Sequence, residues 1–246
     1  MKILVCISKA PDTTSRIAFT DGDTKFDENG VQFIVNPYDE WYALVRGLEL
    51  KETLGGSVTT VTVGGADNDP VIRKALAIGA DNAVRIDADP ADSFDVASQI
   101  VSYAKDQGFD LVLTGKETIN YNSGVTGALI AEMLDMPYVA LATKLDVDGG
   151  TATITREVPG GTEVVEVATP VVLSAAKGMA EQRIPNMRGI MAARTKPLEV
   201  VAGVPSTGQT SIVSYALPPA KGDVKLVDAE NVAELVRLLH EEAKVI

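Results

Sequence analysis

A short segment of small and hydroxyl-bearing residues has the composition of a phosphate-binding loop. Its residues are Ser123, Gly124, Val125 and Thr126. The loop follows a short apolar run at residues 111–113, typical of a strand buried on both faces, and precedes ALIAEML, typical of an apolar helix. This order directs free backbone N–H groups and the positive end of a helix dipole at an anion. The segment predicts a nucleotide phosphate at residues 123–126, although an ordinary βα turn would have the same composition.

The side chains of most acid–base and metal sites are scarce in this sequence. The single cysteine, Cys6, excludes disulfides and clusters of cysteine ligands, and the single histidine, His240, lies in a charged C-terminal stretch. The loops near the predicted phosphate supply only Asp12, Asp39 and Glu117 as carboxylates. The chain contains neither G-x-G-x-x-G nor a P-loop pattern. We therefore expect no catalytic residue and no metal site. If a nucleotide binds, we expect it to be held neither in the dinucleotide-binding manner nor by a P-loop.

The elements that would position this loop alternate between strands and helices. Strands are expected near residues 2–8, 57–64, 82–86 and 110–114, each followed by a helix, with Asp69 expected to cap the second helix. This alternation predicts an α/β fold with a doubly wound, mostly parallel, Rossmann-like sheet. Ligands of such sheets bind beyond the C-terminal ends of the strands, where the strand order reverses. Residues 6–9, 64–65 and 115–126 would meet there, with residues 36–39 closing the crevice.

The second half of the chain follows a different pattern. Alternating segments between residues 143 and 168 predict an antiparallel meander, and a buried strand is expected at residues 170–174. Periodicity is then lost until an apolar helical face within residues 228–244. We interpret residues 177–246 as an arm that lies on a partner, with packing on its own domain as the alternative. The expected units are an α/β nucleotide-binding domain (1–176), a partner-recognition region (177–199) and a C-terminal arm (200–246).

Composition sets further limits. The 246 residues carry a net charge of −12, which argues against a broad nucleic-acid surface because such surfaces are basic. No apolar run approaches the roughly 20 residues needed to span a bilayer, and the N-terminal apolar run is too short for a signal peptide. We expect a cytoplasmic protein that is not embedded in a membrane.

Several segments together resemble the β subunits of electron transfer flavoproteins. The matching segments are ILVCISK at the N-terminus, Val35–Pro37, residues 72–81, residues 110–116 with Thr126-Gly127, the turn at residues 157–161, and residues 181–199. The resemblance runs from Met1 to about Val201 and more weakly to the end. It implies an adenine nucleotide alpha hydrolase-like fold and a heterodimer with an α subunit that holds the redox FAD. Such a dimer is an electron carrier rather than an enzyme. It passes electrons from flavin dehydrogenases, for example the acyl-CoA dehydrogenases of fatty acid β-oxidation, to a downstream acceptor.

The resemblance also implies a structural AMP in the crevice of this chain. The residues it implies for this site are Cys6, Asn36, Pro37, Tyr38, Asp39, Gly64, Gly115, Lys116, Asn122, Ser123, Gly124, Val125 and Thr126. The adenine would lie near Cys6, Asn36 and Gly64, and the phosphate on the amides of residues 123–126. In electron-bifurcating relatives a second FAD replaces AMP and NADH is oxidised. Thr126-Gly127 resembles the AMP-binding members, whereas Glu117 and residues 120–122 depart from the family's glutamine and acidic run.

A second set of residues resembles the family's recognition loop for partner dehydrogenases. The implied partner-binding residues are Arg183, Met187, Ile190 and Met191. Counted without gaps, Met187 occupies the position of the family's anchoring leucine, Ile184 that of a tyrosine, and Arg188 that of a proline. These departures leave the identity of the dehydrogenase open. The C-terminal arm and helix would dock on the α subunit.

Two other functions remain open from the sequence. The first is a free-standing adenine-nucleotide-binding protein of the stress type, built on the same α/β scaffold. The second is an interaction module whose glycine-rich loops are only turns. Co-purification discriminates among the three, because only the electron carrier would be isolated as a yellow complex with a second chain.

Overall fold

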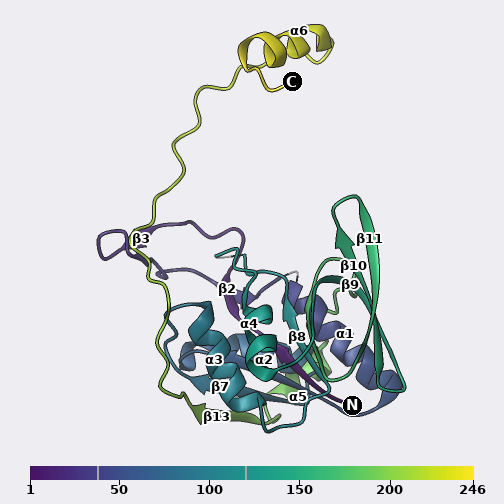
Figure 1. Ribbon diagram of the computed structural model, residues 1–246. Helices are drawn as coiled ribbons and strands as arrows, with labels where there is room; N and C mark the ends of the chain where they lie inside the picture. The colour runs from purple at the N-terminus through teal and green to yellow at the C-terminus, as the bar shows by residue number, and fades with distance from the viewer. Residues whose placement is uncertain (38, 120) are drawn as a thin grey trace.

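A nine-stranded sheet organises the body of the protein. The computed structural model describes residues 1–37, 39–119 and 121–246, and within them the strand order of this sheet is β11-β10-β9-β12-β8-β1-β6-β7-β13. Figure 1 shows the sheet with helices packed around it. The strands are β1 (Lys2–Cys6), β6 (Ser57–Val63), β7 (Asn82–Asp87), β8 (Leu111–Gly115), β9 (Tyr138–Asp148), β10 (Thr151–Val158), β11 (Gly161–Ala168), β12 (Val171–Ala175) and β13 (Leu198–Ala202).

The order of the parallel strands reverses beside β1. The chain runs from β1 to β6 and β7 on one side, then returns to β8 on the other side of β1. All of these neighbours pair in parallel, as does β12 with β8. The predicted doubly wound, mostly parallel sheet is therefore confirmed, and its reversal point lies between β1 and β8.

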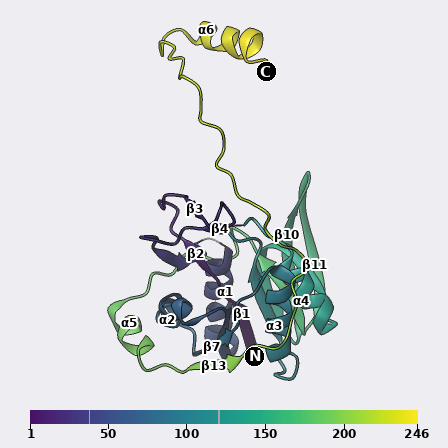
Figure 2. The same ribbon diagram turned by 90° about the vertical axis from the view of Figure 1, so that its left-hand side faces the viewer.

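Helices cover both faces of the sheet (Figure 2). They are α1 (Asp39–Leu54), α2 (Asp69–Ile78), α3 (Ser93–Ala104) and α4 (Thr126–Leu134). Ile3 and Val5 of β1 belong to the core cluster that contains apolar residues of α1 and α2, whereas Leu4 and Cys6 belong to the cluster of α3 and α4. Because successive side chains of a strand point to opposite faces, β1 separates two cores, and each needs its own helix pair.

The start of α2 differs from the sequence prediction that Asp69 caps it. A short 3₁₀ turn, η1 (Ala66–Asn68), precedes the helix, and Asn68 occupies the N-cap position. Asp69 is instead the first helical residue, and its Oδ1 lies 2.9 Å from Nε of the buried Arg85. A buried guanidinium requires a charged partner, and Arg85 lies beside two carboxylates, those of Asp69 and Asp87.

Short strands flank the sheet near the N-terminus. β2 (Lys9–Pro11) pairs with β5 (Phe33–Val35), and β3 (Phe19–Thr20) pairs with β4 (Lys25–Phe26), both antiparallel. They form a separate layer beside the C-terminal ends of the central strands (Figure 1).

The predicted antiparallel meander is present and is longer than expected. β9, β10 and β11 pair antiparallel in sequence, and Gly149, Gly150 and Gly160 take positive φ angles at their turns. β9 already begins at Tyr138 and also pairs in parallel with β12. The meander therefore extends the central sheet rather than forming a separate unit.

Residues 177–202 return to the body of the protein. Helix α5 (Met187–Ala193) packs against α2, and β13 pairs in parallel with β7 at the edge of the sheet. For this stretch the structure shows the alternative that the sequence left open, packing on its own domain. The non-local pairing of β13 with β7 explains why the local sequence pattern did not indicate it.

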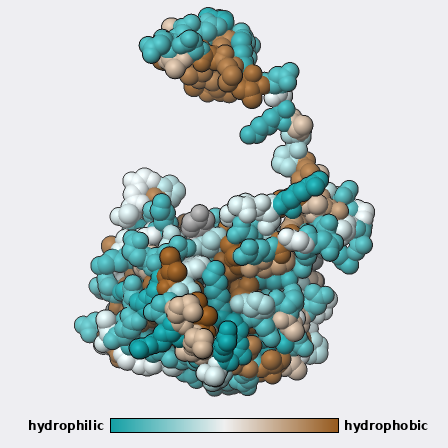
Figure 3. Space-filling model, turned by 180° about the vertical axis from the view of Figure 1, so that it is seen from behind, coloured by the Kyte–Doolittle hydropathy of each residue, from teal (hydrophilic) through white to brown (hydrophobic). Residues whose placement is uncertain are grey.

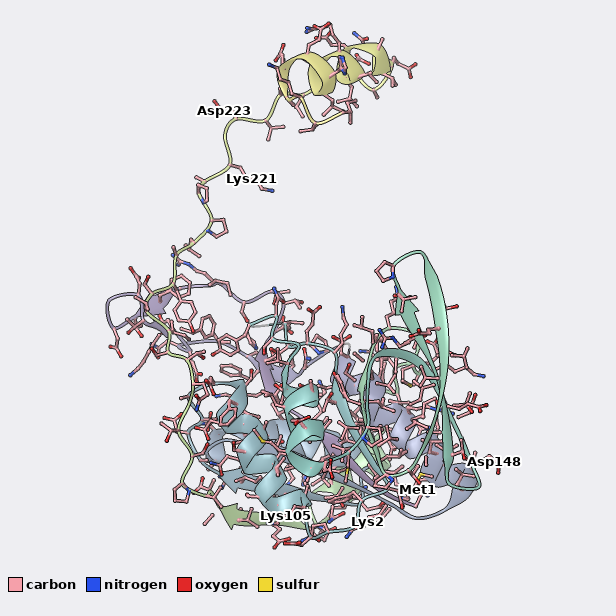
Figure 4. The ribbon with its side chains drawn as sticks, in the orientation of Figure 1. Met1, Lys2, Lys105, Asp148, Lys221 and Asp223 are labelled. Carbon is pink, nitrogen blue, oxygen red and sulfur yellow. The ribbon has the colours of Figure 1, made fainter. Side chains whose placement is uncertain are left out.

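The segment after β13 leaves the body by stages. Residues 203–215 run along the body, residues 216–231 extend away from it, and helices α6 (Val232–Arg237) and η2 (Leu238–Glu242), a π-helix, end the chain. Lys221 and Asp223 lie on the extended stretch, far from the body (Figure 4). Apolar side chains cover one face of the terminal helices (Figure 3). No helix among the described residues combines the length and the apolar character needed to cross a membrane.

Candidate functional site

A cavity of about 740 Å³ opens at the reversal point of the sheet. Cys6 at the end of β1, Val63 at the end of β6 and Gly115 at the end of β8 contribute to its walls, together with residues 123–126 before α4. This is the position at which doubly wound sheets bind ligands. The volume lies within the range of small-molecule sites.

The N-terminus of α4 faces this cavity. Val125 occupies its N-cap position, and no side chain of the described residues caps the helix there. By contrast, Asp92 caps α3 by accepting a hydrogen bond from the Asp95 backbone N–H at 3.0 Å. The first backbone N–H groups of α4 can therefore bind an anion in the cavity, assisted by the helix dipole.

Two glycines allow the elements around the loop to approach closely. A Cβ atom on Gly115 would lie 2.9 Å from Cγ of Glu40 and 3.0 Å from Cβ of Asp39, and one on Gly127 would lie 2.8 Å from Oγ1 of Thr114. The end of β8 thus contacts the first turn of α1, and α4 packs directly on β8. These contacts fix the position of the loop between them.

Hydroxyl groups gather near the loop. The Ser123 and Ser93 hydroxyls lie 2.7 Å apart, which joins the loop to the first residue of α3. The Thr118 hydroxyl oxygen is buried without a hydrogen-bond partner among the described residues, and Thr118 lines the cavity. Buried hydroxyls ordinarily have a partner, so this group is suited to a polar ligand.

A buried acid lies beneath the cavity. Glu40 in the first turn of α1 accepts hydrogen bonds from the backbone N–H and the hydroxyl of Ser8, both at 2.6 Å. Burial raises the pKa of Glu40 to about 8, against the opposing effect of the Ser8 hydrogen bonds. Burial, and then the neighbouring Glu40, also raise the pKa of the Cys6 thiol, so Cys6 is a neutral thiol at physiological pH. These groups present little negative charge toward a bound anion.

A segment from the far end of the chain forms another wall. We call residues 203–215 the strap. Gln209, Thr210 and Ile212 of the strap line the cavity. Oδ2 of Asp92 accepts hydrogen bonds from the backbone N–H groups of Gln209 and Thr210, both at 2.7 Å, and from the Thr210 hydroxyl at 3.0 Å. The Tyr215 ring stacks on the Phe19 ring, with the two ring centroids 5.0 Å apart.

The structure brings together about half of the residues that the sequence indicated for the site. Those lining the cavity are Cys6, Gly115, Ser123, Gly124, Val125 and Thr126. Gly64 lies instead in an adjoining hollow of about 620 Å³, which shares Lys9, Val63 and Pro90 with the first.

Several of the other indicated residues support the loops instead of lining the cavity. Asn36 is fully buried, and its side chain donates a hydrogen bond to the Glu117 carbonyl at 2.9 Å. The Pro37 carbonyl accepts a hydrogen bond from Gln182. Asp39 is buried at the start of α1, and burial raises the pKa of its carboxyl group.

The remaining indicated residues lie around the same loop. The Lys116 ammonium pairs with Glu117 at 2.9 Å, and this hydrogen bond raises the pKa of Lys116. Asn122 takes a left-handed conformation with φ 50°. Tyr38 lies outside the described residues.

The predicted partner-binding residues divide into two groups. Met187, Ile190 and Met191 are exposed on α5, together with Ile184 in the preceding loop. We call these four side chains the docking patch. Arg183 lies beside them, but its guanidinium forms two hydrogen bonds with the carboxylate of Glu52 on α1.

Some cavity residues were not indicated by the sequence. Asp92 and Ser93 follow β7, and the same rule that selected the loops after β1, β6 and β8 would have selected this loop as well. Glu40 reaches the cavity because the first turn of α1 packs against the end of β8, and there it meets Ser8, which lies within the indicated residues 6–9. Gln209 and Thr210 come from the strap, and no local pattern signals a contact with residues more than a hundred positions earlier.

Comparisons with known proteins identify relatives along the full chain. Residues 23–205 match the family model described as "Electron transfer flavoprotein domain". The chain is 37% identical over 260 aligned positions to the electron transfer flavoprotein subunit beta of Bacillus subtilis (strain 168), with 100% of both chains covered. It is 36% identical over 235 positions to that of Syntrophomonas wolfei, covering 94% of this chain and 92% of the relative. It is 30% identical over 255 positions to that of Homo sapiens, covering 100% and 99%.

Proposed function

Because the chain belongs to the electron transfer flavoprotein family, as one of its β subunits, we propose that its cavity holds a structural AMP. In this proposal the chain pairs with an α subunit that carries the redox FAD. The dimer works in the cytoplasm and passes electrons from a flavin dehydrogenase, such as an acyl-CoA dehydrogenase of fatty acid β-oxidation, to a downstream acceptor. The flavin supplies the electron chemistry, while this chain binds, orients and recognises.

The observation that carries the nucleotide proposal is the uncapped N-terminus of α4 in the cavity. Within the described chain, Ser123 and Thr126 line the cavity beside the uncapped start of α4, so backbone N–H groups and hydroxyls are available at the end of the parallel sheet. These are donors, and donors suit a phosphate. Val61, Ile100 and Leu129 supply the apolar walls that a base would contact. The residues present therefore fit a mononucleotide.

Measuring the nucleotides in the purified heterodimer tests this proposal. Denaturing the dimer and separating the released nucleotides should yield one AMP and one FAD per dimer. Two FAD molecules and no AMP would overturn the AMP assignment in favour of the electron-bifurcating alternative. A colourless monomer that hydrolyses ATP would overturn the electron-carrier role as well.

The arm supports the proposed heterodimer. Val232, Leu235 and Val236 on its helix are 61%, 45% and 49% exposed. Figure 3 shows an apolar face on the terminal helices. An isolated helix of this length is not stable in water, so its apolar face requires another surface. We propose that this surface belongs to the α subunit.

The docking patch supports the proposed contact with a dehydrogenase. Met187 is 72% exposed, and Ile184 is 80% exposed. A flexible methionine side chain can fill an irregular apolar pocket, and exposed apolar side chains of this size indicate a binding surface when they are grouped.

Replacing Met187 with alanine tests the docking role. The half-saturating concentration of the dimer in an acyl-CoA dehydrogenase assay should rise roughly tenfold, because a buried interface methionine contributes about 1–2 kcal/mol. Flavin content should stay at the wild-type value. Loss of flavin would indicate instead that the patch stabilises the dimer.

A further inference from the structure

The docking patch is held in place by neighbouring elements rather than by its own helix. Helix α5 spans only Met187–Ala193, and helices this short are unstable in isolation. Most of its side chains are exposed, and Ala193 is its one buried residue among those described. The geometry of the patch must therefore come from contacts of α5 with its neighbours, both along α2, where Gly189 lies against Ala77, and at the two ends of the helix.

Helix α1 holds the N-terminal end. The Trp41 indole N–H donates a hydrogen bond to the Arg183 carbonyl at 3.2 Å. The Arg183 guanidinium then reaches Glu52, with Nη1–Oε1 and Nη2–Oε2 distances of 2.6 and 3.1 Å. This two-point pairing fixes both the position and the direction of the arginine. Trp41 is itself 8% exposed, with the Lys74 ammonium 5.0 Å from its ring centre.

Helix α2 holds the C-terminal end. Its Arg73 donates hydrogen bonds to the carbonyls of Ala193 and Lys196, at 2.8 and 2.7 Å. The Lys196 ammonium donates in turn to the Leu76 and Ala80 carbonyls at the end of α2. Both sets of bonds satisfy carbonyls at helix ends, so they also stabilise the helices that they join.

We infer that Trp41 and Glu52 are positioning residues that hold the docking patch in its binding geometry for a flavin dehydrogenase with an apolar pocket. The inference rests on the proposed function of the patch. It also reassigns Arg183, whose guanidinium is directed at α1 and whose backbone carbonyl is bonded to Trp41. In this assignment Arg183 acts within the chain, and the apolar side chains contact the partner.

The physical reason is the cost of ordering a loop on binding. A segment held in its bound conformation before contact loses less conformational entropy when the partner arrives, so it binds more tightly. Glu52 lies outside the patch and has no contact with the flavin in this assignment. Loss of the Glu52 charge should therefore weaken binding of the dehydrogenase but leave the rate of electron transfer within the bound complex unchanged.

Glu52→Gln in the heterodimer tests the inference. The variant keeps the size of the side chain and removes its charge. We expect the half-saturating concentration of the dimer toward acyl-CoA dehydrogenase to rise about fivefold at an unchanged maximal rate, as suits an exposed ion pair. Hydrogen exchange of the peptide covering residues 181–191 should become faster. Trp41→Phe, which removes the N–H donor and keeps an aromatic ring, should have the same two effects.

A matched control and a rescue accompany these variants. Glu163→Gln removes the charge of another exposed glutamate paired with an arginine, Arg156 on β10, and should change neither measurement. The exchanged pair Glu52→Arg with Arg183→Glu should restore both toward the wild-type values. If Glu52 acted on the structure in a way unrelated to the patch, the swapped pair would not restore the two measured values.

The outcomes separate this inference from the proposed function. If Met187→Ala leaves half-saturation unchanged, the docking role of the patch is wrong. If Met187→Ala raises half-saturation while Glu52→Gln alters neither half-saturation nor hydrogen exchange, the positioning role is wrong. A fall in maximal rate for Glu52→Gln at unchanged half-saturation would also overturn the positioning role.

Discussion

Glu40 occupies the first turn of α1, where an acidic side chain commonly faces water near the positive end of the helix dipole. In this protein the same residue is buried against Gly115 and bonded to Ser8. The burial of Glu40 could not be predicted from the sequence, because it depends on how closely β8 approaches α1. Gly115 permits that approach, and its identity becomes informative only once the two elements are known to be neighbours.

The pKa of Glu40 predicts a pH-dependent stability. Its folded-state pKa of about 8 lies above the ordinary value of 4.5, so the folded protein retains a proton that the unfolded chain has lost. The stabilisation is complete below about pH 4.5 and is lost as the pH rises through about 8. Relative to Glu40→Gln, the free energy of unfolding of the wild type should fall by roughly 1 kcal/mol per pH unit across this window. Urea denaturation of both proteins between pH 4.5 and 9 measures the difference, and parallel pH profiles would contradict the prediction.

At the scale of elements, the strap connects two parts of the chain that the sequence keeps far apart. Asp92 caps α3 with one carboxylate oxygen and holds the strap with the other. Hydrogen bonding from the Asp95 N–H, and then from the strap, lowers the pKa of Asp92 to about 2, so the carboxylate is charged at neutral pH. Strands and helices with strong local periodicity were predicted from the sequence. The strap and β13 were not, because their hydrogen bonds join distant residues.

Asp92→Asn should release the strap and leave α3 folded. The amide keeps one acceptor oxygen for the helix, but its NH₂ group cannot accept hydrogen bonds from Gln209 and Thr210. Hydrogen exchange of residues 203–215 should rise by roughly tenfold, since several hydrogen bonds are lost together. AMP affinity, measured by calorimetry, should fall with it because the strap forms a wall of the cavity. Asp106→Asn, near the other end of α3, is the control. Equal hydrogen exchange of residues 203–215 in both variants would argue against the role of Asp92 in holding the strap.

At the scale of the molecule, the body carries an arm that extends from it (Figure 1). The sequence indicated the sheet, the loop before α4 and the helical arm, since each has a local signature. It placed the start of the arm too early, because residues 177–202 gain their structure from contacts with α1, α2 and β7. The resemblance also implied Asn36 and Asp39 for the nucleotide site; both are buried beside the loops and neither is among the residues that line the cavity.

Gly124→Glu should prevent AMP from binding at the proposed site. A Cβ atom at this position would lie 3.0 Å from the Lys116 carbonyl oxygen, and the added carboxylate would repel a phosphate at the N-terminus of α4. Saturating AMP should raise the melting temperature of the nucleotide-free wild-type dimer by about 5–10 °C but leave that of the variant unchanged. Gly161→Glu, at an exposed glycine with open space around it, should respond as the wild type does. An equal response of all three proteins would count against the site.

In the proposed heterodimer, the extended residues 216–231 would act as a tether between the body and the terminal helix. Fully stretched they reach about 50 Å, so the arm can search a large volume while the body remains in place. Once the body touches the α subunit, binding of the arm becomes intramolecular, at an effective concentration set by the tether rather than by the cell. Separation then requires both surfaces to release together, which makes the pairing long-lived. If the docking patch binds a dehydrogenase as proposed, that contact is made without the tether, and the dehydrogenase would leave after each electron exchange. In this proposal the tether would make the contact with the α subunit longer-lived than the contact with the dehydrogenase.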